Sequence, residues 1–368
     1  MRRTLSRLLL VVAGLGVGFA IVELAVRAAE APVDATDLRS IHELQPDADW
    51  LYRMRPGAIA SPESGPRYAI NARGFRDRER SLSKPPGSFR ILVVGDSVTF
   101  GFGVELEETY PSLLESRLRE SLPGIEVLNL GVGGYNPYTE SALLRGVGLA
   151  YEPDLVLVQF CINDLADPTI HFDNHARTRL GTLPDAAFPN PGMRTHDTGG
   201  RSLVERVCFA SKLCLRGYDW WLARTQAKID APTRHLGALP IEHTEGPEWK
   251  WLAARYREMA DAARKAGADF GLLLFPHRRL LLRPADAGPD PVQSRLERLA
   301  REEGWPVVDL LPHFLDAQRG GDVFLDYWHP SPRGHAATVV AIESELGCAG
   351  LLGGIRSSEC PGALQPEH

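Results

Sequence analysis

The sequence predicts an α/β fold built on a mostly parallel sheet. Short apolar runs rich in β-branched residues alternate along the chain with longer segments of helical period, which is the pattern of βαβ units. The runs are continuously apolar rather than alternating, as in strands that are buried on both faces of a parallel sheet. Several of them end directly in glycine, aspartate or asparagine. Polar side chains are therefore expected together at the carboxyl edge of the sheet.

The stretch 90–103 is the centre of this prediction. Its apolar residues 91–94 read as a buried strand that Gly95 ends, and the following loop carries Asp96 and Ser97. Because ligands bind at the carboxyl ends of strands in open α/β sheets, Ser97 is placed to act as a nucleophile. The glycine spacing does not fit a dinucleotide fingerprint or a phosphate-binding loop, and the G-x-S-x-G elbow of other hydrolases is absent.

The remaining elements follow from the same periodicities. Further strands are expected at 125–130, 155–160, 270–275 and 306–310, and helices at 109–122, 139–149, 248–266, 291–303 and 332–346. A glycine-rich loop containing Gly134 follows the second strand, and the third strand leads into Asn163 and Asp164. The loop before the last helix carries Asp326 and His329.

Composition shifts divide the chain into four parts. These are an N-terminal membrane anchor or signal segment (1–30), an arm packed on the main domain (31–88), the main domain (89–347) and a C-terminal tail (348–368). A long insertion at 165–245 interrupts the main domain and is expected to form a lid or a substrate-binding wall. Within the arm, short strands are expected at 50–54 and 68–70, and the turn at 71–77 is expected to pin the arm to the main domain.

The pattern of the first thirty residues predicts that the main domain is exported from the cytoplasm. Three arginines precede an uncharged run at 8–22, which favours leaving the N-terminus in the cytoplasm. The run alone fits a signal peptide, but extended to Val26 it is long enough to span a membrane. Arg27 and Glu30 make a poor cleavage region, which favours an uncleaved single-pass anchor in the inner membrane with the main domain outside the cytoplasm. Secretion after cleavage is the alternative.

Charge and cysteine content narrow the class of protein. A net charge of -6 and a pI near 6.0 give no basic footprint, so nucleic acid is not an expected partner. In an oxidising compartment, Cys208 with Cys214 and Cys348 with Cys360 could each close a short loop, although spacing leaves the pairing open. Cys161 lies in an apolar run and is expected to be a buried thiol.

The polar groups at the strand ends can together perform nucleophilic catalysis. A serine needs a base within hydrogen-bond reach, and that base is usually held by a carboxylate on its other nitrogen. Asp326 can meet the Nδ1 hydrogen of His329, three residues later, while Nε2 faces Ser97. The oxyanion of acyl transfer needs donors, and we expect them from the backbone N–H groups of Ser97 and Gly134 and the side-chain amide of Asn163.

These residues resemble the conserved blocks of the SGNH (GDSL-type) hydrolase family. The matching blocks are, in order, Gly95-Asp96-Ser97, Gly134, Asn163-Asp164 and Asp326-x-x-His329. The resemblance implies that Ser97 is the nucleophile, Gly134 and Asn163 are oxyanion donors, and Asp326 and His329 are the acid and base. It also implies a flavodoxin-like three-layer α/β/α sandwich and ester or acyl chemistry without a metal or cofactor.

Some positions near these blocks depart from the family pattern or are expected to be structural. Val98 stands where the family name has leucine, and Cys161 stands where the third block has glycine. Four polar side chains are expected to pack or to tie loops together rather than to react: Asp96, Asp164, His277 and His335.

The sequence therefore predicts a serine ester hydrolase or deacylase. Its expected substrate is an ester-bearing small molecule, lipid or polysaccharide, because the insertion and exported arm look like those of envelope-associated family members. An O-acyltransferase acting on extracytoplasmic polysaccharide would use the same acyl-enzyme, and a non-catalytic envelope binding module would keep the fold alone.

Overall fold

The computed structural model describes residues 2–28, 38–45, 49–63, 65–165, 247–284 and 289–354. Nearly all of the predicted insertion lies outside these residues, as do Cys208, Cys214 and Cys360. Cys161 is a buried free thiol, as predicted, and Cys348 is disulfide-bonded.

A five-stranded parallel sheet forms the centre of the domain and confirms the predicted fold class. Its strands, in spatial order, are β6 (Ile125–Gly131), β5 (Phe89–Gly95), β7 (Leu155–Phe160), β8 (Asp269–Leu274) and β9 (Val307–Asp309). The chain reverses its direction of travel across the sheet between β5 and β7. A crevice at the carboxyl ends of strands is expected at such a switch point, and Ser97 and Asn163 follow these two strands.

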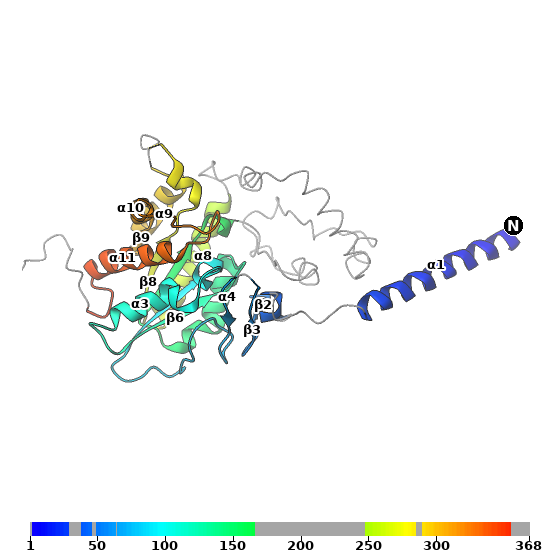
Figure 1. Ribbon diagram of the computed structural model, residues 1–368, viewed down its shortest axis with the longest axis horizontal. Coiled ribbons are helices and arrows are strands. Elements are labelled where there is room, and N and C mark those ends of the chain that lie inside the picture. The colour runs from blue at the N-terminus through cyan, green and yellow to red at the C-terminus, as the bar shows by residue number, and fades with distance from the viewer. Residues whose placement is uncertain are drawn as a thin grey trace, which may run out of the picture. The chain divides into compact units, whose positions relative to one another are not determined.

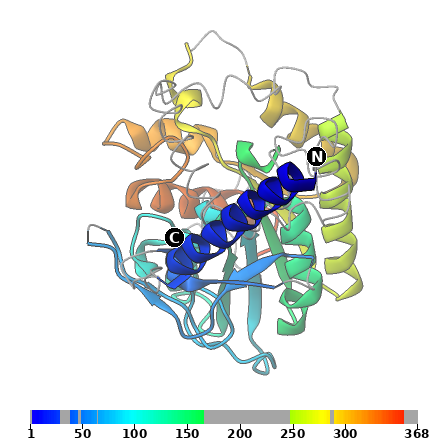
Figure 2. The ribbon, with the colours of Figure 1, turned by 90° about the vertical axis from the view of Figure 1, so that its right-hand side faces the viewer.

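Helices cover both faces of the sheet and complete the three-layer sandwich (Figures 1 and 2). One layer contains α3 (Tyr110–Leu118), α10 (Leu311–Gln318) and α11 (Pro332–Cys348), and the other contains α4 (Pro137–Gly146), α8 (Pro247–Lys265) and α9 (Pro291–Glu303). Ile91 and Val93 of β5 share a buried cluster with Leu114 of α3 and Ile342 of α11. The apolar side chains of each strand are therefore buried on both faces, as the unbroken runs indicate.

The structure differs from the predicted elements where helices are short. The residues after Gly95 form a one-turn helix, α2 (Ser97–Phe100), and α10 was not predicted. One or two turns are too short for a 3.6-residue period to stand out in the sequence. The predicted helix at 139–149 is divided into α4 and a 3-10 helix, η3 (Gly148–Tyr151).

The N-terminal arm forms two small antiparallel ribbons. After a 3-10 helix, η1 (Leu38–Ile41), strand β1 (His42–Leu44) pairs with β2 (Tyr52–Met54), and β3 (Ile59–Ala60) pairs with β4 (Tyr68–Ala69). Strands β2 and β4 lie where strands were predicted, whereas β1 and β3 were not predicted. Two- and three-residue strands carry too little alternation to be recognised.

A buried arginine joins the arm to the nucleophile segment. The Arg76 guanidinium donates hydrogen bonds to the carbonyls of Phe100 and Val104 at 3.1 and 2.6 Å, and it lies 4.4 Å from the centre of the Tyr68 ring. The carbonyls at the end of a helix have no partner within it, so Arg76 satisfies groups at the end of α2. The turn predicted at 71–77 thus fixes the arm against the loop that carries Ser97.

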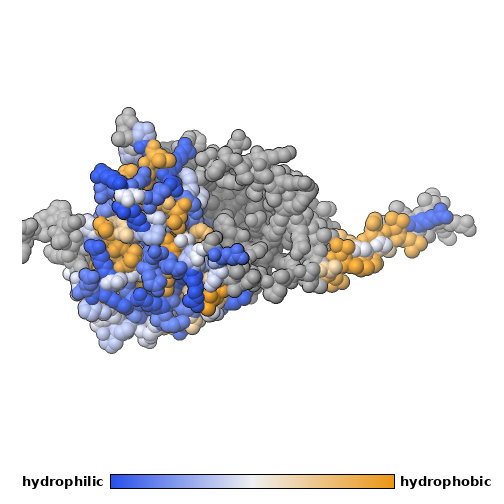
Figure 3. All heavy atoms as spheres, in the orientation of Figure 1, coloured by the Kyte–Doolittle hydropathy of each residue, from blue (hydrophilic) through white to orange (hydrophobic). Residues whose placement is uncertain are grey.

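Helix α1 (Arg2–Ala28) falls in a different compact unit from the arm and the main domain. Figure 3 shows apolar side chains along its surface, and Leu10 and Leu15 are among those exposed. No helix in the described part of the chain is both long and apolar enough to cross a bilayer. The predicted membrane anchor and the predicted export both stay predictions.

Candidate active site

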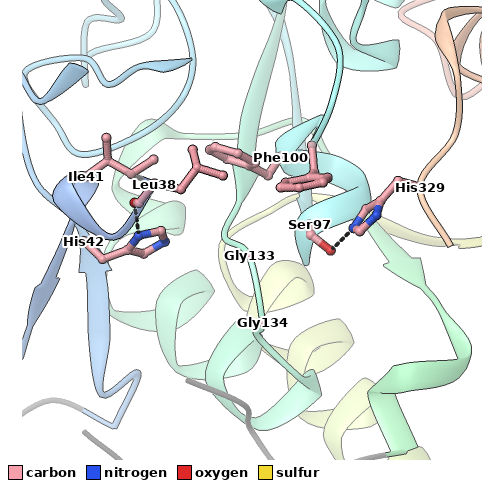
Figure 4. Close-up of a pocket in the computed structure, with 9 residues that line it drawn as sticks. Leu38, Ile41, His42, Ser97, Phe100, Gly133, Gly134 and His329 are labelled. Atoms are coloured by element: carbon pink, nitrogen blue, oxygen red, sulfur yellow. Dashed lines mark hydrogen bonds between the residues drawn. The ribbon is translucent and has the colours of Figure 1, made fainter. Parts of the chain in front are cut away.

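The structure brings Ser97, His329 and Asp326 into one chain of hydrogen bonds. The Ser97 Oγ lies 2.9 Å from His329 Nε2, and His329 Nδ1 lies 2.6 Å from Asp326 Oδ2. Ser97 begins α2, directly after β5, and faces His329 (Figure 4). Both His329 and Asp326 come from the loop before α11. The order of these three groups is the one that a serine nucleophile, its base and an orienting carboxylate require.

Asp326 fixes both the conformation of its own loop and the tautomer of the His329 imidazole. Its Oδ1 accepts the backbone N–H groups of Trp328 and His329, at 2.8 and 2.9 Å. Partial burial opposes ionisation, but the hydrogen bonds and charge of His329 outweigh it and hold the pKa of Asp326 at about 2. An ionised carboxylate only accepts, so Nδ1 of His329 carries the hydrogen and Nε2 is left to accept the Ser97 proton.

Hydrogen bonds and close backbone packing fix the turn that carries Ser97. Asp96 caps α2 by accepting the Val98 N–H at 2.9 Å. The Gln159 amide oxygen, on β7, accepts the Asp96 N–H at 3.1 Å and the Thr99 hydroxyl at 3.0 Å. A Cβ at Gly131 would lie 2.2 Å from the Phe100 nitrogen, so only glycine lets β6 approach α2 this closely.

The three predicted oxyanion donors come from three neighbouring strand ends. The Ser97 N–H is in the first turn of α2, where N–H groups have no partner within the helix. Gly134 has φ +79°, a backbone conformation that favours glycine. It lines the cavity next to Ser97. Asn163 Nδ2 lies 2.6 Å from Asp96 Oδ2, and its second N–H can serve an oxyanion.

Asp96 therefore links the nucleophile turn to Asn163. The side chain is fully buried, and burial raises its pKa against the opposing hydrogen bonds from Val98 and Asn163. Asp164 is also buried and accepts the Cys161 N–H at 3.1 Å, which closes the loop after β7. Both aspartates sit where loops are tied together, the position predicted for them.

Tyr52, on arm strand β2, contacts the oxyanion loop and was missed by sequence reasoning. Its hydroxyl donates a 2.6 Å hydrogen bond to the Gly133 carbonyl. That carbonyl and the Gly134 N–H belong to the same peptide group, so the hydrogen bond fixes the plane of the expected oxyanion donor. Hydrogen bonding at a carbonyl also polarises the N–H of the same group. No local pattern marks this tyrosine, which sits in a three-residue strand.

We expect Tyr52→Phe to lower kcat for a short-chain ester by about tenfold, the worth of one neutral hydrogen bond, while KM changes little. The reason is that the Gly134 N–H would be less well aligned for an oxyanion that exists only in the transition state. Steady-state kinetics would test this, with Tyr151→Phe as control, because Tyr151 is also buried but lies in η3. A rise in KM at constant kcat would contradict this role.

His277 and His335 do not join the triad. His277 stacks on Tyr327 with ring centres 5.2 Å apart, and burial lowers its pKa to about 4. His335 is fully buried, and its Nδ1 accepts the Tyr110 backbone N–H at 3.2 Å. Its place in α11 and its stacking on the Tyr110 ring agree with the predicted packing role.

Burial lowers the pKa of His335 to about 3, so this residue makes stability depend on pH. An unfolded histidine binds a proton below about pH 6.5, whereas the folded chain resists protonation until about pH 3. The free energy of unfolding should therefore fall as pH decreases through this window, by up to about 1.4 kcal/mol per pH unit from this group.

Denaturant unfolding of wild type and His335→Gln at about pH 7 and about pH 5 would measure this contribution. The variant should lose less stability on acidification than wild type. His313→Gln is the control, because His313 lies on α10 and is not fully buried. Equal losses in wild type and His335→Gln would refute the prediction.

Residues of the N-terminal arm line the cavity beside Ser97, a role that the sequence did not indicate. Leu38, Ile41 and His42 line it (Figure 4). Phe102 also lines it, and the centre of its ring lies 4.6 Å from that of His329. Among the residues the structure describes, no group of three or more His, Cys, Asp and Glu side chains is arranged to hold a metal ion.

Comparison with known proteins gives one short sequence match and several structural ones. An arylesterase from Vibrio mimicus is 34% identical over 77 residues, which are 21% of this chain and 38% of that protein. LAE5, an alpha/beta hydrolase enzyme from the metagenome of Lake Arreo, Spain, has 15% identity and a TM-score of 0.43, covering 73% of this chain and 97% of its own. A catalytic mutant of Axe2, an acetylxylan esterase from Geobacillus stearothermophilus, has 16% identity and a TM-score of 0.42, covering 72% and 96%.

A match to a family covers much more of the chain than the arylesterase match does. Residues 93–337, about two thirds of the sequence, match the GDSL-like Lipase/Acylhydrolase family. The matched region begins within β5 and ends within α11, so it includes Ser97, Gly134, Asn163, Asp326 and His329. This chain belongs to the GDSL-like Lipase/Acylhydrolase family, a family of ester hydrolases.

Proposed function

We propose that the protein hydrolyses carboxylic esters through an acyl-enzyme formed on Ser97. The observation that carries this proposal is the chain of hydrogen bonds from Ser97 Oγ through His329 to Asp326. A serine with no base would be a poor nucleophile, whereas one hydrogen-bonded to an imidazole that can accept its proton can give up that proton as it attacks.

In the first half-reaction, Ser97 Oγ bonds to the ester carbonyl carbon while its proton moves to His329 Nε2. The carbonyl oxygen becomes an oxyanion, which the N–H groups of Ser97 and Gly134 and the amide of Asn163 would stabilise. The tetrahedral intermediate collapses, the bond to the leaving alcohol breaks, and His329 returns the proton to the alcohol oxygen. Asp326 stays ionised and stabilises the imidazolium that forms in between.

In the second half-reaction, water takes the place of the alcohol. His329 removes a proton from the water as its oxygen bonds to the acyl carbon. When this second intermediate collapses, the bond to Ser97 Oγ breaks and the serine recovers a proton from His329. The products are the free acid and the unchanged protein.

A fluorophosphonate probe tests the proposal directly, because it phosphonylates only an activated serine. Mass spectrometry of the labelled protein should show one adduct, mapped to Ser97, and none in Ser97→Ala. Absence of labelling in correctly folded wild type would refute the proposal. Incubation with an acyl donor and an oligosaccharide distinguishes hydrolysis from acyl transfer, because hydrolysis releases free acid and transfer yields acylated sugar.

A further inference from the structure

An apolar cavity of about 280 Å³ lies beside Ser97. The main domain contributes Phe100 and Phe102 to its wall, and the N-terminal arm contributes Leu38, Ile41 and His42. Among the described lining residues, only His42, Ser97 and His329 carry polar side-chain atoms. Such a lining favours an apolar group over a sugar, whose hydroxyls would lose their hydrogen bonds to water without finding partners.

The arm residues lie on the far side of Ser97 from His329. In Figure 4, His329 and the arm residues Leu38, Ile41 and His42 stand on opposite sides of Ser97 and Phe100. The leaving alcohol must lie near His329, because His329 Nε2 returns a proton to its oxygen. The acyl chain of the ester leaves the carbonyl carbon in the other direction, toward Phe100 and the arm.

We propose that the arm segment from Leu38 to His42 is the distal wall of an acyl-binding pocket, and that the preferred acyl group is an apolar chain longer than acetyl. This inference rests on the proposed function and adds the chemical class of the substrate. An acetyl group ends one carbon beyond the carbonyl and would leave most of the cavity unfilled. A longer chain replaces water with contacts to Phe100, Phe102 and Leu38.

The wall is held in place rather than loosely apposed. The Ile41 carbonyl accepts the Arg55 N–H at 2.5 Å, and the His42 ring donates through Nδ1 to the Leu38 carbonyl at 3.0 Å. Strand β1 follows directly and pairs with β2, whose Tyr52 bonds to Gly133 beside the expected oxyanion donor. The same ribbon therefore links the acyl wall to the catalytic loop.

The preference can be measured with nitrophenyl esters of acetate, butyrate, hexanoate and octanoate. Each methylene that enters an apolar pocket should raise kcat/KM by about fourfold until the chain meets the arm, after which the gain should stop. Leu38→Trp places a larger side chain at the wall. It should lower the ratio of kcat/KM for hexanoate to that for acetate by about tenfold or more.

Leu282→Trp is the matched control, because Leu282 is an exposed leucine on a 3-10 helix, η8 (Arg278–Leu282), that does not line the cavity. It should leave the hexanoate-to-acetate ratio unchanged. Fluorophosphonate labelling of each variant reports whether the active serine is still formed. A Leu38→Trp variant that is labelled and keeps the wild-type ratio would overturn the acyl-wall proposal.

The outcomes also separate this inference from the proposed function. Turnover that requires Ser97 but is insensitive to chain length would leave the esterase intact and reject the pocket. A preference for acetate in wild type would reject it as well. If the Ser97→Ala variant kept both labelling and turnover, the proposed function itself would be rejected.

Discussion

Replacing Ser97 with alanine is expected to lower kcat for a short-chain nitrophenyl ester by about 10⁴-fold or more. The substitution removes the Oγ that lies 2.9 Å from His329 Nε2, so no acyl-enzyme can form. The residual rate would come from the oxyanion donors and substrate binding alone. Initial rates measured on purified protein, corrected for uncatalysed hydrolysis, would give the ratio.

The fold of α2 should survive this change, because its cap is the Asp96 side chain rather than that of Ser97. Circular dichroism and the thermal midpoint should therefore match those of wild type. Ser116→Ala is the control, since Ser116 is an exposed serine on α3. Retention of more than a small fraction of wild-type kcat in Ser97→Ala would remove Ser97 from the mechanism.

Asp326→Asn is expected to reduce kcat by about 10⁴-fold while leaving the loop folded. The asparagine oxygen can still accept the Trp328 and His329 N–H groups that Asp326 Oδ1 accepts now. Its amide would instead donate to His329 Nδ1, which would place the imidazole hydrogen on Nε2. In that tautomer His329 cannot accept the Ser97 proton.

The pH–rate profile supplies a second measurement on the same residue. Because the pKa of Asp326 is about 2, its carboxylate stays ionised above about pH 4, and the wild-type profile should show no inflection from this group there. Asp322→Asn is the control, since it removes an exposed carboxylate four residues earlier that pairs with Arg278. An Asp326→Asn variant as active as Asp322→Asn would show that Asp326 does not orient the base.

The predicted strands were located well because each is a local property. Strand β7 (Leu155–Phe160) begins and ends at the predicted residues, and helix α9 (Pro291–Glu303) does as well. Apolar runs and helical periods can be read within a window of a few residues. Four short elements were not predicted, for the same reason: α2, α10, β1 and β3 contain too few residues to show a helical or alternating pattern in the sequence.

The arm shows the opposite case. Its turn at 71–77 is evident in the sequence, but nothing there shows that Leu38 and Ile41 would face Ser97. Tyr52 and Gly133 are 81 positions apart in sequence, and their contact is made by the tyrosine hydroxyl. Because every tyrosine has a hydroxyl, the residue type does not reveal which partner it bonds. Contacts of this kind depend on how two ribbons pack on the sheet, and packing leaves no local pattern in one sequence.

The sequence by itself determined the α/β class, the strand positions and the order of the blocks that contain Ser97, Gly134, Asn163, Asp326 and His329. These follow from residue types at short spacing, where the chain's own geometry decides the structure. Only the tertiary structure decided that Ser97 Oγ and His329 Nε2, 232 positions apart in sequence, lie within one hydrogen bond and that the arm lines the cavity beside them. The physical reason is that sheet order and burial bring distant loops together, and both depend on the whole chain at once.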